Sequence, residues 1–144
     1  MATINPYLTF NGNAEKAMNF YRSVFGGEFM GEVNRFKAMP DSENLSPEDG
    51  EKVMHVALPI GNGTTLMASD TIEGMGQPFK SGNNFSISIH TENEEEAHRL
   101  FNGLSAGGQV AMPLEKTFWA ALFGMFTDKF GIQWMVNYDE GQNT

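Results

Sequence analysis

The sequence contains no cysteine, which removes disulfide bonds, thiolate nucleophiles and cysteine-ligated zinc or iron–sulfur sites from consideration. It is also poor in basic residues: nine lysines and arginines face 18 aspartates and glutamates, and the formal net charge is −9. A chain with so few cations neutralises few phosphates, so neither nucleic acids nor anionic membranes are expected partners. Any metal site would have to use histidine, aspartate or glutamate.

Long apolar runs are absent as well. No stretch approaches the roughly 20 residues that a transmembrane helix needs, and the first ten residues lack the basic and apolar regions of a signal peptide. The chain of 144 residues, 40% of them hydrophobic, has the size and composition of one globular domain, 1–144. We therefore expect a single cytoplasmic domain.

What the sequence does contain is an internal repeat. A shift of 80 residues aligns Asn13 with Asn93 and Gly27 with Gly107, and apolar positions between them recur at helical spacing. Asparagine is a good helix N-cap, and glycine suits the left-handed residue at a helix end. Each copy is therefore predicted to hold one helix of about three turns, because these signals lie about that far apart.

Extended segments surround each predicted helix. The predicted strands are residues 4–10, 28–37, 53–60 and 64–69 in the first copy, and 85–90, 109–112, 118–127 and 132–138 in the second. The first copy is longer because of 39–52, an acidic segment with two prolines that is predicted to be a surface loop. The pattern predicts an α+β fold of two tandem βαβββ modules, about 1–75 and 80–140, with a cleft between their curved sheets.

Two segments carry a family resemblance: PYLTFNGNAEKAMNFYRSVFGG near the start and TFWAALFGMFTDKFGIQWMVN near the end. They resemble the PhnB-like branch of the glyoxalase/bleomycin-resistance superfamily. The resemblance implies the vicinal-oxygen-chelate fold, homodimers, and members that include metal-dependent isomerases, dioxygenases and metal-free drug-binding proteins. Relatives often bear the label demethylubiquinone methyltransferase. This sequence, however, lacks the glycine-rich strand-to-helix turn that holds a nucleotide-like methyl donor in doubly wound folds.

The resemblance also indicates where a metal would bind. Metal-using members of the superfamily place histidine, glutamate or glutamine at four strand positions, which match Pro6, Met67 or Ala68, Ser86 and Met135 here. None of these side chains is a competent ligand for a hard or borderline divalent cation. We therefore predict no metal and no other cofactor at the usual site. A displaced metal site would draw on the remaining ligand-type residues near predicted strands: His55, Asp70, His90 and Glu115.

The same positions offer soft apolar surface with a few polar groups, which suits a small organic ligand. The residues predicted to bind it are Met67, Ser86, Phe118, Trp119, Gln133 and Met135. His55 is the first candidate for acid–base catalysis and Glu115 the second. Each has a structural alternative: the methionines and aromatics would fill a core, His55 would be a hydrogen-bonded sheet residue, and Glu115 an exposed loop carboxylate.

Three functions follow, in this order. The first is metal-independent binding of a small organic molecule. The second is an enzyme of the isomerase, lyase or dioxygenase type that uses a relocated metal or acid–base chemistry at His55, which requires at least two of the polar candidates to converge. The third is a structural homodimer whose cleft is filled by side chains.

Overall fold

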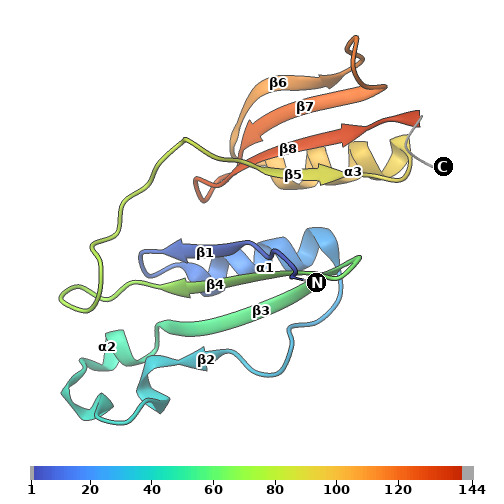
Figure 1. Ribbon diagram of the computed structural model, residues 1–144. Coiled ribbons are helices and arrows are strands. Elements are labelled where there is room, and N and C mark those ends of the chain that lie inside the picture. Colours follow the sequence, from blue (N-terminus) through green and yellow to red (C-terminus); the bar gives the residue numbers. More distant parts are fainter. Residues whose placement is uncertain (1, 141–144) are drawn as a thin grey trace. The chain divides into compact units, whose positions relative to one another are not determined.

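The computed structural model describes residues 2–140, which divide after Lys80 into two compact units (Figure 1). Each unit holds a four-stranded sheet and one helix of 12 residues. The predicted α+β fold of two tandem βαβββ modules is therefore confirmed. No helix among the described residues has the length and apolar character that crossing a membrane requires.

In the first unit the strand order is β1-β4-β3-β2. Strand β1 (Tyr7–Phe10) runs parallel to β4 (Thr64–Asp70), and β4 forms an antiparallel hairpin with β3 (Val53–Gly61). The short strand β2 (Asn34–Arg35) pairs with β3 at the edge. Helix α1 (Ala14–Phe25) follows β1 directly, and the chain then continues to β2 at the opposite edge of the sheet.

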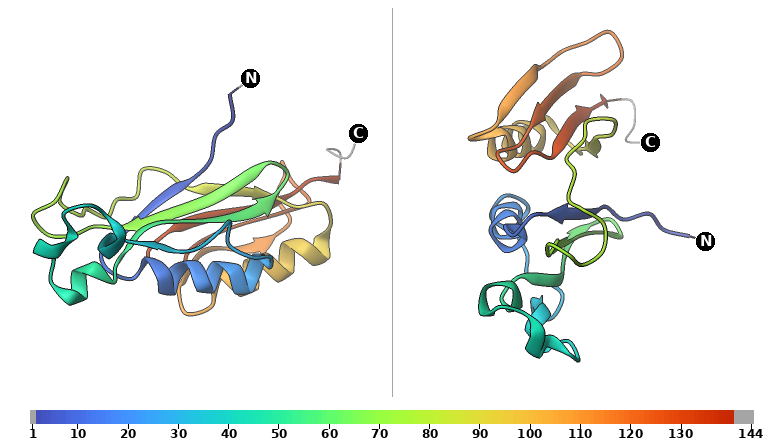
Figure 2. Two further views of the ribbon diagram at one scale, coloured as in Figure 1. Left: turned by 90° about the horizontal axis from the view of Figure 1, so that it is seen from below. Right: turned by 90° about the vertical axis from the view of Figure 1, so that its left-hand side faces the viewer.

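Helix α1 covers one face of the first sheet (Figure 2). Its buried side chains recur at helical spacing: Ala14, Ala17, Met18 and Tyr21. They pack with buried sheet residues that alternate along their strands: Leu8, Phe10, Leu58, Leu66 and Ala68. Because successive strand side chains point to opposite faces, the residues between these lie on the other side, which we call the helix-free face of the first sheet.

The second unit repeats this topology with the order β5-β8-β7-β6. Strand β5 (Ile87–His90) runs parallel to β8 (Gln133–Tyr138), β8 pairs antiparallel with β7 (Leu122–Thr127), and β7 pairs antiparallel with β6 (Gln109–Glu115). Helix α3 (Glu94–Ser105) covers one face. The buried core between helix and sheet consists of Ala97, Leu100, Phe101, Leu104, Phe126, Trp134 and Val136. The opposite side is the helix-free face of the second sheet.

The helix ends follow the sequence signals in three of four cases. Asn93 accepts a hydrogen bond from the Glu96 backbone N–H (2.7 Å), as an N-cap does, and Gly26 and Gly107 have φ of +85° and +79°. The prediction for Asn13 is wrong, because its side chain makes no capping hydrogen bond. A carboxylate from another strand takes that role, as described below.

Two predicted segments differ from the structure. Of the strand predicted at residues 28–37 only Asn34–Arg35 forms, because only these two residues pair with β3. The segment predicted as a loop, 39–52, holds a short 3-10 helix η2 (Ser42–Asn44) and a helical turn α2 (Pro47–Gly50), preceded by η1 (Phe36–Ala38). Helical turn α2 forms because Ser46 caps it and proline suits the first helical position.

Candidate functional site

The helix-free face of the first sheet carries the site that we consider first. Strand pairing places Met67 of β4 between Tyr7 of β1 and Ala57 of β3, all on this face. His55 of β3 lies two residues before Ala57 and shares the face. The Tyr7 hydroxyl and His55 Nδ1 are 3.1 Å apart in a hydrogen bond, and the two rings have centroids 5.7 Å apart. His55 and Met67, two of the predicted site residues, thus lie on the same face of the sheet.

A pocket of about 560 Å³ lies further along the same strands. Thr9 and Ser69, each two residues further along the strands that carry Tyr7 and Met67, line it together with Asp70 at the end of β4. The segment that follows β4 forms the rest, together with Phe36. The apolar side chains lining the pocket are Phe36, Ile72, Met75, Pro78 and Phe79. Its volume lies within the range of about 300–1,000 Å³ typical of small-molecule sites.

The helix-free face of the second sheet carries three more predicted residues. Met135 of β8 lies between Ser88 of β5 and Met125 of β7. Gln133, two residues before Met135, donates a hydrogen bond from Nε2 to the Phe85 backbone carbonyl (2.9 Å). Ser86 is half-buried and precedes β5. Met67 and Met135 therefore occupy equivalent places: each lies on the last strand of its unit, beside the first strand.

Phe118 and Trp119 do not open strand β7 as predicted. They lie in the segment between β6 and β7, in a turn closed by Thr117, whose Oγ1 accepts a hydrogen bond from the Ala120 N–H (3.1 Å). The Thr117 N–H donates in turn to the Ala120 carbonyl (3.1 Å). This double closure takes residues 118 and 119 out of strand pairing. Trp119 still contacts Phe123 of β7, with ring centroids 5.4 Å apart.

The polar candidates for catalysis do not converge within either unit. Asp70 is buried, and its carboxylate accepts backbone hydrogen bonds from Gly12 (3.0 Å), Ala14 (2.8 Å) and Val53 (2.9 Å). It alternates with Ser69 and so lies on the helix side of the sheet, away from His55. Asp70 is therefore the structural cap that replaces Asn13 at the start of α1.

In the second unit, His90 and Glu115 stand at opposite edges of the sheet. The pairing runs from His90 through Asn137 and Phe123 to Glu115, which is three strand spacings or roughly 14 Å. His90 instead contacts Ser88 through Nε2 and Asn137 through Nδ1, each at 3.4 Å. Among residues 2–140, no group of three or more histidine, aspartate or glutamate side chains is placed to hold a metal ion.

The register corrects one of the four positions that the resemblance assigned to a metal. Pro6 precedes β1 and shares the parity of Leu8 and Phe10, which are buried on the helix side. The residue opposite Met67 is Tyr7. The helix-free faces thus offer thioether, phenol and hydroxyl groups at these places, and such a donor set does not fit a hard or borderline divalent cation.

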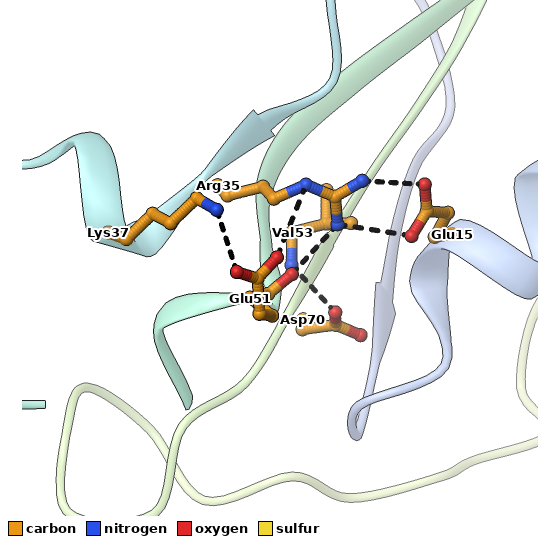
Figure 3. Close-up of polar contacts among 6 residues, drawn as sticks. All are labelled: Glu15, Arg35, Lys37, Glu51, Val53 and Asp70. Atoms are coloured by element: carbon orange, nitrogen blue, oxygen red, sulfur yellow. Dashed lines mark hydrogen bonds and ion pairs between the residues drawn. The ribbon is translucent and has the colours of Figure 1, made fainter. Parts of the chain in front are cut away.

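An ion-pair cluster fixes the edge of the first sheet near Asp70 (Figure 3). Arg35 of β2 donates two hydrogen bonds to the Glu15 carboxylate (3.1 and 2.7 Å) and one to the Glu51 backbone carbonyl (2.8 Å). Lys37 donates to the Glu51 carboxylate (2.7 Å). The hydrogen bonds from Arg35 lower the pKa of Glu15, and that from Lys37 lowers the pKa of Glu51. The cluster ties β2 to α1 and is structural.

Sequence reasoning missed Tyr7, Ser88 and Asn137 as members of the helix-free faces. Tyr7 and Ser88 are strand residues of the right parity, and this signal was available in the alternation of β1 and β5. Asn137 is different. Its Oδ1 is buried without a hydrogen-bond partner while its Nδ2 contacts His90, and neither property has a sequence signal.

Comparison with known proteins identifies a matching family model and a similar protein sequence. A family model described as 3-demethylubiquinone-9 3-methyltransferase matches residues 2–137. Protein YjdN of Escherichia coli (strain K12) is 34% identical over 148 residues, which cover 98% of this chain and 98% of that protein.

Several solved structures are also similar to this chain. Protein PA1353 from Pseudomonas aeruginosa has a TM-score of 0.84 and 41% identity, covering 96% of this chain and 98% of that one. A putative 3-demethylubiquinone-9 3-methyltransferase, PhnB protein, from Bacillus cereus has a TM-score of 0.75 and 28% identity, covering 95% and 99%. A glyoxalase/bleomycin resistance protein/dioxygenase family enzyme from Burkholderia phytofirmans PsJN is 13% identical with a TM-score of 0.61, covering 93% and 95%, and shares the fold.

Proposed function

We propose that this chain, which belongs to the PhnB-like family, binds a small organic molecule. The family model is described as 3-demethylubiquinone-9 3-methyltransferase, and the chain has the glyoxalase/bleomycin-resistance fold. Each unit is proposed to contribute the helix-free face of its own sheet as a binding surface. His55 and Met67 contribute in the first unit, and Ser86, Gln133 and Met135 in the second. We do not extend the family description to methyl transfer, because two βαβββ sheets differ from the doubly wound sheet that carries a nucleotide-like donor.

One observation supports this proposal most. The largely apolar pocket of about 560 Å³ is lined by Thr9 and Ser69, which lie two residues beyond Tyr7 and Met67 on strands β1 and β4. Small-molecule sites commonly combine an apolar cavity with a few placed polar groups, because apolar contact provides affinity and the polar groups fix orientation. Thr9 and Ser69 add hydroxyl groups to its lining.

Binding is proposed to be independent of a metal at the usual superfamily positions, because the side chains there are poor ligands for divalent cations. We expect less than one equivalent of tightly bound divalent metal in purified protein and an unchanged melting temperature after chelation. A metal that binds only the folded state would stabilise it by mass action, so its removal would lower that temperature. A full equivalent of zinc, nickel or iron contradicts this part of the proposal.

Native mass spectrometry of freshly purified protein, followed by a thermal-shift screen of small metabolites, tests the binding. We expect a ligand that raises the melting temperature of the parent protein and whose effect is lost in Ser69→Phe, which fills the pocket. Ser23→Phe is the matched control, because Ser23 is exposed on α1 of the same unit. His55→Gln should weaken the ligand's effect, whereas His98→Gln on α3 should not.

Two results would reject the proposal. If no ligand shifts the parent protein, or if Ser69→Phe only destabilises the fold while ligand affinity is kept, the sheet face is not a binding surface. The structural homodimer would then take its place. An enzyme remains the second candidate from the sequence. Of the partners considered for His55, which were Asp70, His90 and Glu115, Asp70 is engaged by three backbone N–H groups, so no observation favours this candidate.

A further inference from the structure

A separate pocket lies at one end of the second unit. The segment between β6 and β7, the first residue of α3 and the residues after β8 enclose about 430 Å³. The lining residues are Glu94, Lys116, Thr117, Phe118, Trp119, Ala120, Ala121, Asp139 and Glu140. None of them lines the pocket of the first sheet, so this cavity is a different site from the one proposed above.

Its aromatic side chains are exposed without a role in the core. Phe118 is 97% exposed and Trp119 46% exposed, although both rings are large and apolar. Exposed apolar groups are informative when they cluster, because folding alone gives no reason to hold them in water. The turn closed by Thr117 keeps them there by fixed hydrogen bonds.

The rings stand at steep angles to one another. Phe118 and Trp119 have centroids 4.7 Å apart and planes at 85°, and Trp119 and Phe123 have centroids 5.4 Å apart and planes at 66°. Rings arranged in this way present their faces in different directions. The negative face of an aromatic ring attracts a cation within about 6 Å of its centre, and groups of such rings recognise substituted ammonium ions.

The charged side chains around the pocket also favour a cation. Glu94, Asp139 and Glu140 line it together with one basic residue, Lys116. Asp139 already has another interaction partner, but Glu94 and Glu140 alone outnumber Lys116, so the lining favours a cation over an anion. An inorganic ion would gain little from the rings, whereas an organic cation gains from both the rings and the carboxylates.

We propose that this pocket binds an organic cation, a substituted ammonium group, through the faces of Trp119 and Phe118 and the carboxylates of Glu94 and Glu140. This inference does not depend on the function proposed above, because it concerns other residues in the other unit. Either one can fail while the other stands.

Calorimetric titration of the full chain with choline, and with its neutral isostere 3,3-dimethyl-1-butanol, tests the proposal. Both ligands have the same shape, so the difference between them measures the charge. We expect saturable choline binding and an affinity about two- to fivefold weaker for the neutral alcohol, since a cation–π contact at exposed rings, about 0.5–1 kcal/mol, corresponds to that factor. Equal affinities, or no saturable choline binding at millimolar concentration, overturn the proposal.

Variants locate the site. Trp119→Ala and Phe118→Ala should each weaken choline binding several-fold, and Trp119→Phe should weaken it less because a ring remains. Phe118 is 97% exposed, so its replacement tests binding without disturbing the fold. Glu94→Gln should weaken choline binding and reduce its dependence on salt, whereas Glu95→Gln, which lies in the same helical turn but outside the pocket, should not.

One alternative has its own result. The exposed rings would instead serve contact between two copies of the chain if Phe118→Ala turns a dimer into a monomer in light scattering and leaves choline affinity unchanged. That combination rejects the cation site.

Discussion

Asp70 connects the start of α1 to the start of β3 in the first unit. Its carboxylate accepts hydrogen bonds from backbone N–H groups at the start of α1 and the start of β3. We expect Asp70→Asn to lower the free energy of unfolding by about 2–4 kcal/mol, because the amide keeps one acceptor oxygen and places an NH2 donor against the remaining buried N–H. Urea unfolding followed by far-ultraviolet circular dichroism measures this. Asp41→Asn is the control: Asp41 has φ of +65°, which asparagine tolerates. Equal stabilities of the two variants would contradict the role of Asp70.

The Arg35–Glu15 pair makes a pH-dependent contribution. Hydrogen bonds from Arg35 lower the pKa of Glu15, so its stabilisation is full above the pKa of an unfolded glutamate and is lost as pH falls through the lowered value. Glu15→Gln should therefore cost at most about 1 kcal/mol at neutral pH, since the pair is partly exposed and screened by water. The difference should shrink below about pH 4. Unfolding curves at several pH values measure it. A difference that grows on acidification would contradict this assignment, and Glu28→Gln, an exposed pair with Arg22, is the control.

At the scale of elements, the close approach of α3's end to β7 depends on Gly108. A Cβ placed there would lie 2.1 Å from the Thr127 carbonyl oxygen, which is far inside contact distance. We expect Gly108→Ala to destabilise the second unit by about 3 kcal/mol or more, because backbone atoms must shift to accept the methyl group. Fluorescence of the buried Trp134 during denaturation reports on this unit. Gly82→Ala is the control, because nothing lies within 4 Å of its Cβ, and it should change little.

Elements with local signals were predictable from the sequence, and elements defined by distant partners were not. Asn93 caps α3 within its own turn, so the sequence predicted it. The cap of α1 comes from Asp70, 56 residues beyond the N–H of Ala14, and no local pattern announces such a contact. Strand β2 is short for the same reason, since its extent depends on pairing with β3.

The candidate site divides in the same way. The family resemblance selected Met67 and Met135 by their match to superfamily metal positions, and in the structure both lie on the helix-free faces. The contact between Tyr7 and His55 joins residues 48 positions apart and was not predicted. Phe118 and Trp119 were assigned to a strand because aromatic residues favour strands, but the hydrogen bonds of Thr117 with Ala120 outweigh that preference.

At the scale of the whole molecule, strand β6 is an exposed edge of the second sheet. Val110 and Met112 are exposed on it, although edge strands with open apolar groups tend to pair or aggregate. We expect the chain to form a homodimer at micromolar concentration that covers this strand, and Val110→Lys with Met112→Lys to shift it to monomer. Size-exclusion chromatography with light scattering measures both. A parent protein that is only monomeric contradicts the dimer. As a control, Glu94→Lys with Glu95→Lys, at exposed positions on α3, should leave the mass of the assembly in solution unchanged.

The parallel pairing of β1 with β4 has a consequence for synthesis on the ribosome. Phe10 must wait for Asp70, 60 positions later in the chain, before it has a neighbour in the sheet. At translation rates of about 5–20 residues per second, that delay is roughly 3–12 s. During this interval α1 lacks its carboxylate cap and the first strand is an unpaired apolar segment. We therefore expect the nascent first unit to stay incompletely folded for seconds, until the hairpin β3–β4 has been synthesised.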